Sequence, residues 1–200
     1  MKLPMPAAVL AGGASRRMGV PKATLPYGRS TLGEHQIERL ASVFREVWFV
    51  TREAPAFSPG AARLLYDRDP ERSAISGLMR ALEEPQNGEP DHVFVLAVDL
   101  PLVPEAVLRA IAVRALASSA AAVLPEVAGE LDPLAGVWCR AALPEARKRV
   151  ATGDRSLRGL ARAVGAEAFP ESAWRALDPS GNAFANLNTV DDWVVARERA

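Results

Sequence analysis

The chain has 200 residues, 49% hydrophobic and 24% charged, a composition typical of a globular protein that can bury its own core. Lys plus Arg and Asp plus Glu both number 24, so no overall field attracts nucleic acid or an anionic membrane. One cysteine, Cys139, excludes an internal disulfide framework and fits a reducing compartment. No apolar stretch is long enough to span a membrane, so we expect a soluble cytoplasmic protein whose anion sites are local.

Apolar runs and helical repeats alternate along the chain. Continuous apolar or β-branched runs predict strands, and apolar residues that recur at helical intervals predict helices. The predicted strands are 5–11, 46–51, 62–66, 92–98, 120–125 and 134–139. The predicted helices are 31–44, which begins with Thr31 as N-cap and Glu34 three residues later, 76–84, 105–117, 141–150, 156–164 and 190–199. This order predicts one domain, residues 1–200: a Rossmann-like three-layer α/β/α sandwich with a mostly parallel sheet.

The first predicted strand ends in a glycine-rich, basic loop, GGASRRMGVPK, at residues 12–22. Its glycine spacing matches neither the G-x-G-x-x-G fingerprint nor the P-loop. The glycines nevertheless let main-chain N–H groups approach a ligand, and Arg16 and Lys22 can neutralise charge on phosphate oxygens. We interpret the segment as a phosphate-binding loop; the alternative is an ordinary strand-to-helix turn with solvated arginines.

The most apolar predicted strand, HVFVLAV at 92–98, leads directly into Asp99 and a proline-stiffened turn. In a parallel sheet the ligand crevice lies at the carboxyl ends of the strands, so we expect Asp99 beside the glycine-rich loop. Mg²⁺ prefers one or two carboxylates, with substrate phosphates and waters completing its shell. We interpret Asp99 as an Mg²⁺ ligand; the alternative is a turn aspartate that caps backbone amides.

Two further pairs of polar residues lie where they could contact a ligand, one after the third predicted strand and one before the last predicted helix. Asp67 and Asp69 follow the third predicted strand in the same crevice, where Asp67 either contacts a nucleotide or metal or belongs to an exposed charged loop. Asn186 and Asn188 are two residues apart on an extended stretch, so both amides face one side and can bind a polar ligand. The alternative for the asparagines is turn and capping chemistry before the last predicted helix.

Three motifs, LAGGASRRMG followed by Lys22, VDLPLVP and NLNTVDD, resemble the molybdenum cofactor guanylyltransferases, within the wider family of small nucleotidyltransferases. Their order and spacing cover nearly the whole chain. The resemblance implies transfer of GMP from Mg·GTP to the molybdenum cofactor (molybdopterin), giving molybdopterin guanine dinucleotide and pyrophosphate. Its only implied cofactor is Mg²⁺. We further expect a monomer that makes transient contact with the maturation proteins of molybdoenzymes.

The resemblance also implies roles for individual residues. Main-chain contacts to guanine and phosphates are implied for Leu10, Ala11, Gly12 and Gly13. Arg16 and Lys22 are implied to stabilise the phosphates, and Asp67 to contact the nucleotide. Asp99 is implied to bind Mg²⁺.

Asn186 and Asn188 match the family's asparagine pair, which the resemblance places on the pterin side. Three departures concern the site. Pro21 stands where the family usually has an aspartate before the loop lysine, and Arg52 follows a strand that usually ends in a base-binding asparagine. The segment 73–77, SAISG, keeps only the last glycine of the family's Gly-Pro-Leu-x-Gly. They leave two alternatives open: a cytidylyl- or sugar-phosphate nucleotidyltransferase, and a non-catalytic adaptor that binds nucleotide or cofactor.

Overall fold

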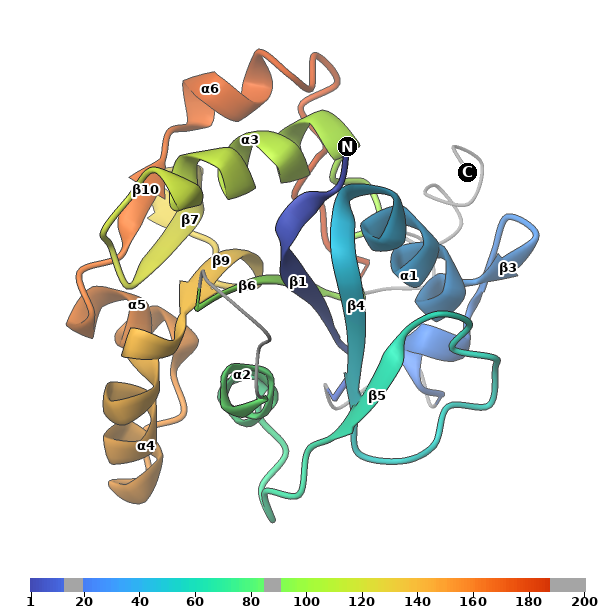
Figure 1. The fold of residues 1–200 in the computed structure, drawn as a ribbon, viewed down its shortest axis with the longest axis horizontal. Coiled ribbons are helices and arrows are strands. Elements are labelled where there is room, and N and C mark those ends of the chain that lie inside the picture. Colours follow the sequence, from blue (N-terminus) through green and yellow to red (C-terminus); the bar gives the residue numbers. More distant parts are fainter. Residues whose placement is uncertain (13–19, 85–90, 188–200) are drawn as a thin grey trace.

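The computed structural model describes residues 1–12, 20–84 and 91–187, and within them an eight-stranded sheet forms the centre of the molecule (Figure 1). In spatial order its strands are β10 (Glu167–Phe169), β7 (Ala122–Val127), β9 (Ala135–Cys139), β6 (His92–Ala97), β1 (Leu3–Leu10), β4 (Phe44–Thr51) and β5 (Arg63–Tyr66), and β8 (Glu130–Leu131) pairs with β7. The predicted helix 190–199 lies outside the described residues.

Strand direction sets where the site can form. β1 is parallel to both β4 and β6, and β4 is parallel to β5, so the carboxyl ends of these four strands meet at one edge of the sheet. β9 runs antiparallel between β6 and β7, while β10 returns parallel to β7. The connection from β7 through β8 to β9 is short enough for antiparallel pairing, whereas parallel neighbours need a longer crossover. The predicted mostly parallel sheet is confirmed, with β9 as an antiparallel addition.

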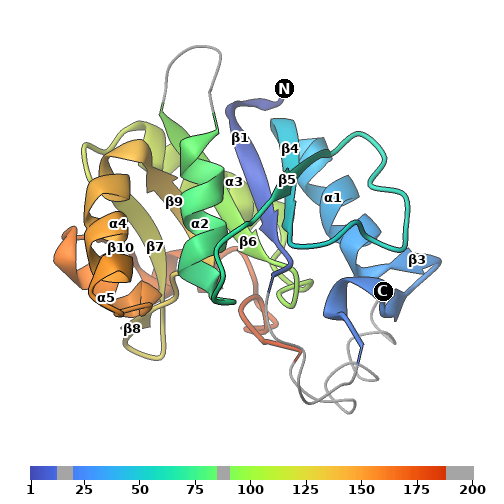
Figure 2. The ribbon, with the colours of Figure 1, turned by 90° about the horizontal axis from the view of Figure 1, so that it is seen from below.

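Helices cover both faces of the sheet. They are α1 (Leu32–Val43), α2 (Ala74–Glu83), α3 (Glu105–Leu116), α4 (Leu143–Ala151), α5 (Leu157–Ala163) and α6 (Glu171–Arg175). α1 and α3 lie on one face, and α2, α4 and α5 lie on the other (Figures 1 and 2). Short elements complete the described chain: the 3₁₀ turns η1 (Lys22–Thr24) and η2 (Arg140–Ala142) and the small pair β2 (Pro26–Tyr27) and β3 (Ser30–Thr31). This arrangement confirms the predicted three-layer sandwich.

A hydrophobic core lies on each face of the sheet, because successive side chains along a strand point to opposite faces. Val9 and Phe94 point into the layer that α1 and α3 cover, whereas Ala8 and Val95 point into the layer that α2 covers. All four are fully buried. Because both faces of the sheet are covered, its central strands are continuous apolar runs in the sequence.

The predicted capping box at the start of α1 is confirmed. The Thr31 hydroxyl accepts from the Glu34 N–H at 3.2 Å, and the Glu34 carboxylate accepts from the Thr31 N–H at 2.8 Å.

β10 and α6 were not predicted, because three and five residues are too few to show a periodic apolar pattern.

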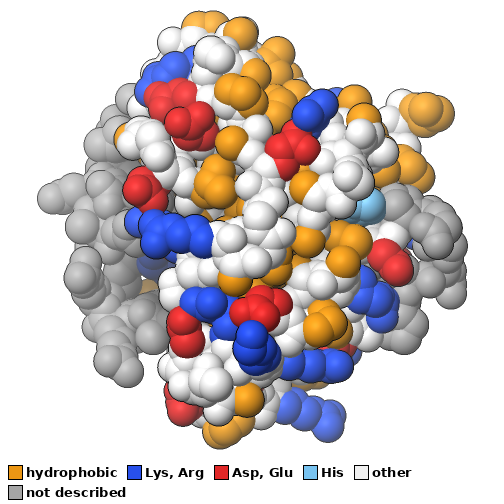
Figure 3. Space-filling model, turned by 90° about the vertical axis from the view of Figure 1, so that its left-hand side faces the viewer, with side chains coloured by type: hydrophobic (Ala, Val, Ile, Leu, Met, Phe, Trp, Pro, Cys, Tyr) orange, Lys and Arg blue, Asp and Glu red, His pale blue; other side chains and the backbone are white. Residues whose placement is uncertain are grey.

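The surface shows no dominant charge on the side drawn in Figure 3, where basic and acidic side chains are interspersed. That mixture agrees with the formal net charge of zero. In the described part of the chain, no helix combines the length and the apolarity needed to cross a bilayer.

Lowering the pH is expected to destabilise the protein through His35. Its ring contacts Tyr27 of β2, with the ring centroids 4.5 Å apart. Burial, and then the positive charge of Arg39, lower the pKa of His35 from 6.5 to about 4. The unfolded chain therefore binds a proton between these two values that the folded protein does not, so stability is lost as the pH falls through that window. We expect His35 to account for a loss of roughly 1–3 kcal/mol, measured by denaturant unfolding at about pH 7 and about pH 4.

A His35→Gln variant separates this effect from the titration of carboxylates. It cannot gain a proton at that position, so its stability should fall less over the same pH range. Equal losses in the two proteins would contradict the assignment.

Candidate functional site

A cavity of about 230 Å³ opens where the carboxyl ends of β1, β4, β5 and β6 meet. Its lining residues are Leu10, Ala11, Gly12, Lys22, Val50, Asp67, Ser73, Ala74, Gly77, Ala97, Val98, Asp99 and Leu134. This is the edge at which open α/β sheets bind ligands. Six residues predicted for the site line this cavity: Leu10, Ala11, Gly12, Lys22, Asp67 and Asp99. Gly13, Arg16 and Asn188 lie outside the described residues.

The end of β1 lines the cavity and is held between neighbouring segments. The Ala11 N–H donates to the Val50 carbonyl at 2.9 Å, and the Leu10 carbonyl accepts from the Val98 N–H at 3.1 Å. These bonds fix the strand end from both sides. A Cβ built at Gly12 would meet no described heavy atom within 4 Å. A ligand can therefore approach this stretch of backbone closely.

Pro21 prepares the position of Lys22. It precedes η1 with φ at −59° and ψ at 126°, and its carbonyl accepts from both the N–H and the hydroxyl of Thr24, at 3.0 and 2.8 Å. The proline ring holds φ near this value without strain. The sequence left Pro21 unexplained; in the structure it begins the turn that presents Lys22 to the cavity.

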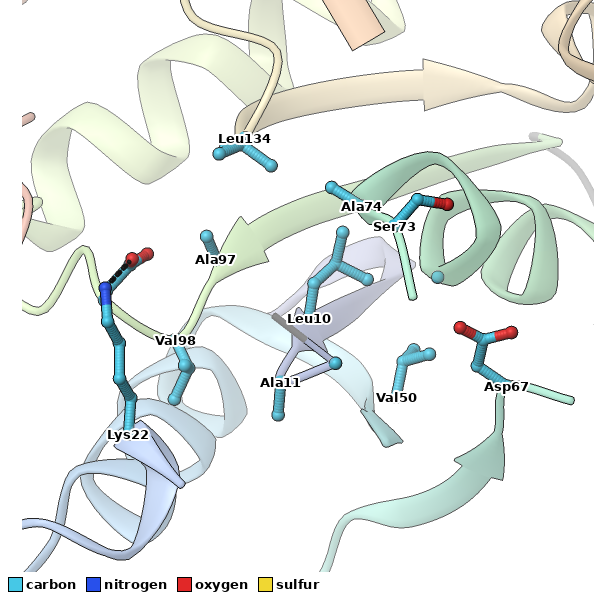
Figure 4. Close-up of a pocket in the computed structure, with 13 residues that line it drawn as sticks. Leu10, Ala11, Lys22, Val50, Asp67, Ser73, Ala74, Ala97, Val98 and Leu134 are labelled. Carbon is cyan, nitrogen blue, oxygen red and sulfur yellow. Dashed lines mark hydrogen bonds and ion pairs between the residues drawn. The ribbon is translucent and has the colours of Figure 1, made fainter. Parts of the chain in front are cut away.

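Lys22 and Asp99 meet at the rim of the cavity (Figure 4). Lys22 Nζ lies 2.6 Å from Asp99 Oδ2, across 77 positions of sequence. The two side chains are 17% and 19% exposed, so water still reaches both groups. A cationic donor and a hard oxygen ligand thus share one place at the strand ends, as phosphate and metal chemistry require.

Asp67 lies across the cavity from Lys22 (Figure 4) and is only 6% exposed. Its Oδ2 accepts from the Ser76 hydroxyl at 2.7 Å and lies 3.7 Å from Arg52 Nη1, while its Oδ1 accepts from the Asp69 N–H at 3.0 Å. The alternative of an exposed charged loop is therefore wrong for Asp67. Arg52, which follows β4, forms the ion pair with this carboxylate.

Asn186 precedes a residue, Leu187, that is hydrogen-bonded to Asp99. The Leu187 N–H donates to the Asp99 carbonyl at 3.0 Å, which ties the C-terminal part of the described chain to the metal-ligand candidate. Asn186 itself is exposed and does not line the cavity. The structure thus bonds the residue after Asn186 to Asp99, but Asn186 itself does not line the cavity.

Comparison with known proteins agrees with this geometry. The family model described as the MobA-like NTP transferase domain matches residues 7–168. A curated relative from Chloroflexus aggregans, named "Probable molybdenum cofactor guanylyltransferase", is 32% identical over 191 residues, covering 92% of this chain and 89% of the relative. The chain belongs to the MobA-like NTP transferase family.

Solved structures show the same fold. Molybdopterin-guanine dinucleotide biosynthesis protein A from Archaeoglobus fulgidus superposes with a TM-score of 0.84 at 25% identity, over 98% of both chains. A protein from Mycobacterium tuberculosis H37Rv, crystallised in complex with manganese, has a TM-score of 0.63 at 18% identity, over 99% of this chain and all of that one. At that identity the second likeness concerns the fold alone.

Several polar side chains of this MobA-like NTP transferase were not predicted for the site. Ser73 caps α2 by accepting from the Ser76 N–H at 3.3 Å, and Arg155 lies 3.2 Å from the Ser73 hydroxyl and 3.0 Å from Asp69 Oδ1. These contacts brace the Asp67 side of the cavity. The N-cap position of Ser73 is readable from sequence, but the contact with Arg155 depends on an approach between distant segments.

Asp132 is a second carboxyl group near Asp99. Burial raises the pKa of Asp132 above its usual value, and the negative charge of Asp99 acts in the same direction. The Leu134 N–H, which donates to Asp132 Oδ1 at 2.9 Å, and the charge of Arg158 act against that rise. No spacing in the sequence distinguishes Asp132 from an ordinary loop residue.

The donor chemistry fits a divalent cation at Asp99. Within the described residues, no three His, Cys, Asp or Glu side chains gather into a metal site of their own. Mg²⁺ is commonly held by one or two carboxylates together with the phosphates of a substrate, and Asp99 at the cavity rim supplies such a carboxylate. The site therefore suits a metal that arrives with a nucleotide.

Proposed function

We propose that this MobA-like NTP transferase moves a guanylyl group from GTP to the molybdenum cofactor (molybdopterin) and releases pyrophosphate. The names of its relatives support these substrates. The observation that carries the proposal is the meeting of Lys22 and Asp99 in the cavity at the carboxyl ends of β1, β4, β5 and β6. One cysteine in 200 residues supports a cytoplasmic location.

The two ends of the cavity suit the two ends of a nucleotide. The Lys22–Asp99 end carries the charges that phosphates need, and the middle is lined by apolar side chains such as Leu10 and Val50 that can pack against a flat base. Asp67, held in place by Ser76, accepts hydrogen bonds at the other end. We place the phosphates beside Lys22 and the nucleoside toward Asp67.

The chemistry is an in-line displacement at phosphorus. An ionised phosphate oxygen of the acceptor forms a bond to the α-phosphorus of GTP, and the bond to the bridging oxygen breaks with its electron pair leaving on pyrophosphate. Lys22 offsets the charge that grows on the leaving group. Asp99 would hold a divalent cation, Mg²⁺ in our proposal, which when bound neutralises phosphate charge. Such a reaction depends on positioning more than on a protein base.

The remaining predicted residues keep the roles that the family resemblance implies. We assign Gly13 to main-chain contacts with guanine and phosphates, Arg16 to the phosphates, and Asn186 and Asn188 to the pterin side of the acceptor. The hydrogen bond from Leu187 to the Asp99 carbonyl supports this assignment for Asn186, because it ties the residue after the asparagine to the turn that carries Asp99.

A thermal-shift titration tests nucleotide choice. Purified protein is titrated with GTP, CTP and UTP, each with Mg²⁺, and GTP is expected to raise the melting temperature at the lowest concentration. An Asp99→Asn variant should lose most of the Mg²⁺-dependent part of that shift. A clear preference for CTP would overturn the guanylyl assignment, and no shift with any nucleotide would overturn nucleotide binding itself.

A further inference from the structure

Helix α1 carries two polar side chains on its inward face. Gln36 is 0% exposed, and burial lowers the pKa of the Arg39 guanidinium below its usual value. Buried amide and guanidinium groups cost stability unless they are hydrogen-bonded. An apolar side chain would pack there without that cost. The hydrogen-bond partners of Gln36 and Arg39 therefore indicate what these two polar side chains do.

Both side chains bind main-chain carbonyls of one turn. Gln36 Nε2 lies 3.4 Å from the carbonyl oxygens of both Ala97 and Val98. Arg39 Nη1 donates to the Pro101 carbonyl at 2.6 Å and to Gln36 Oε1 at 3.0 Å. The two side chains therefore form one connected unit that spans the turn from its first residue to its last.

That turn, residues 97–101, carries Asp99. The Leu100 N–H closes it by donating to the Ala97 carbonyl at 3.2 Å, and the Leu187 N–H donates to the carbonyl of Asp99 itself. The carbonyls on both sides of Asp99 are thus held from α1, and its own carbonyl is held from the C-terminal segment. The Asp99 carboxylate is left to point toward Lys22 at the rim of the cavity.

We propose that Gln36 and Arg39 are positioning residues that fix the turn 97–101 and thereby aim the Asp99 carboxylate at the divalent cation. The inference rests on the proposed function, because it takes Asp99 as the metal ligand. Neither side chain lines the cavity in which we place the nucleotide. Their effect passes through the backbone of the turn.

Arginine and glutamine are suited to this task in different ways. Arg39 contacts both acceptors through one nitrogen, Nη1, whose two N–H bonds have fixed directions in the guanidinium plane; a lysine ammonium on a flexible stem lacks such fixed directions. The glutamine amide donates to the turn with its nitrogen and accepts from Arg39 with its oxygen. An Arg39→Lys variant keeps the charge and loses the planar group that fixes these directions.

The test measures metal binding and stability side by side. Gln36→Leu, Arg39→Lys and Arg39→Met are compared with Ile37→Val and Val43→Ala, which shorten buried apolar side chains of the same helix. Melting temperature reports stability for all five variants. Mn²⁺ binding in the presence of GTP, followed by electron paramagnetic resonance, reports how well Asp99 is positioned. Steady-state kinetics then give the KM for the divalent ion and the KM for the acceptor.

We expect the Gln36 and Arg39 variants to bind Mn²⁺ about tenfold more weakly, because groups that orient a metal ligand typically matter to that extent. Their KM for the divalent ion should rise while the KM for the acceptor stays unchanged. The loss of Mn²⁺ affinity should be smaller in Arg39→Lys than in Arg39→Met. The apolar controls should lose melting temperature without losing Mn²⁺ affinity.

Three outcomes would overturn the proposal; the first two reject the positioning role alone, and the third also rejects part of the proposed function. Wild-type Mn²⁺ affinity in folded Gln36→Leu and Arg39→Lys, or an equal loss in the apolar controls, would reject the positioning role alone. Unchanged Mn²⁺ binding in Asp99→Asn would reject Asp99 as the metal ligand, and with it both the positioning role and that part of the proposed function.

Discussion

Replacing Asp99 with asparagine is expected to slow guanylyl transfer by about 10²–10³-fold, the usual effect of removing one preorganised electrostatic contact. The substitution keeps the size of the side chain and the backbone of the turn, so the hydrogen bond from Leu187 to the carbonyl of residue 99 remains available. The protein should therefore stay folded while the metal site loses its anionic carboxylate and keeps only a neutral amide oxygen. Initial rates of pyrophosphate release, with melting temperature as the measure of folding, check this result.

Asp91→Asn is the matched control. Asp91 is also an aspartate beside β6, but its side chain is exposed and its carboxylate pairs with Arg140 at 3.5 Å, away from the cavity. Its rate should stay close to that of the wild-type protein. Near-normal turnover in Asp99→Asn would remove Asp99 from the reaction.

A Lys22→Met variant is expected to lose a similar factor in rate, about 10²–10³-fold, because the charge on the leaving pyrophosphate is then offset by one cation fewer. Its effect on metal binding should be opposite to that of Asp99→Asn. Lys22 Nζ lies 2.6 Å from Asp99 Oδ2, so a divalent ion that binds Asp99 without nucleotide must compete with the ammonium group. Without GTP, we therefore expect Lys22→Met to bind Mn²⁺ more tightly than the wild-type protein.

The control for this variant is Lys148→Met on α4. Lys148 is a largely exposed lysine whose ammonium pairs with Glu145 at 3.5 Å, so its loss should change neither rate nor Mn²⁺ binding. Weaker Mn²⁺ binding in Lys22→Met without nucleotide would show that Lys22 supports the metal rather than competing with it.

The parts of the fold that were predictable are those that bury both faces of a strand or one face of a long helix. HVFVLAV was recognisable because Phe94 and Val95 face opposite layers and are both fully buried. The direction of β9 was not predictable, since an apolar run looks the same in parallel and antiparallel pairing. β10 and α6 were missed because they are too short to show a period.

The residues of the candidate site that could be predicted are those that directly follow the parallel strands. The rule that ligands bind at the carboxyl ends of parallel strands places Asp67 and Asp99 in one crevice, and both line the cavity. Gln36 and Arg39 could not be found in this way. They occupy ordinary helix positions, and their partners are carbonyls about 60 residues away, a contact that only the packing of α1 against the sheet creates.

The most direct test is product formation by the purified protein. It is incubated with molybdenum cofactor, GTP and Mg²⁺, and the products are followed by mass spectrometry together with pyrophosphate release. Molybdopterin guanine dinucleotide should form in equal amount to pyrophosphate, and both should be nearly lost in Asp99→Asn. Absence of the dinucleotide under conditions where the protein binds GTP would contradict the proposed transfer.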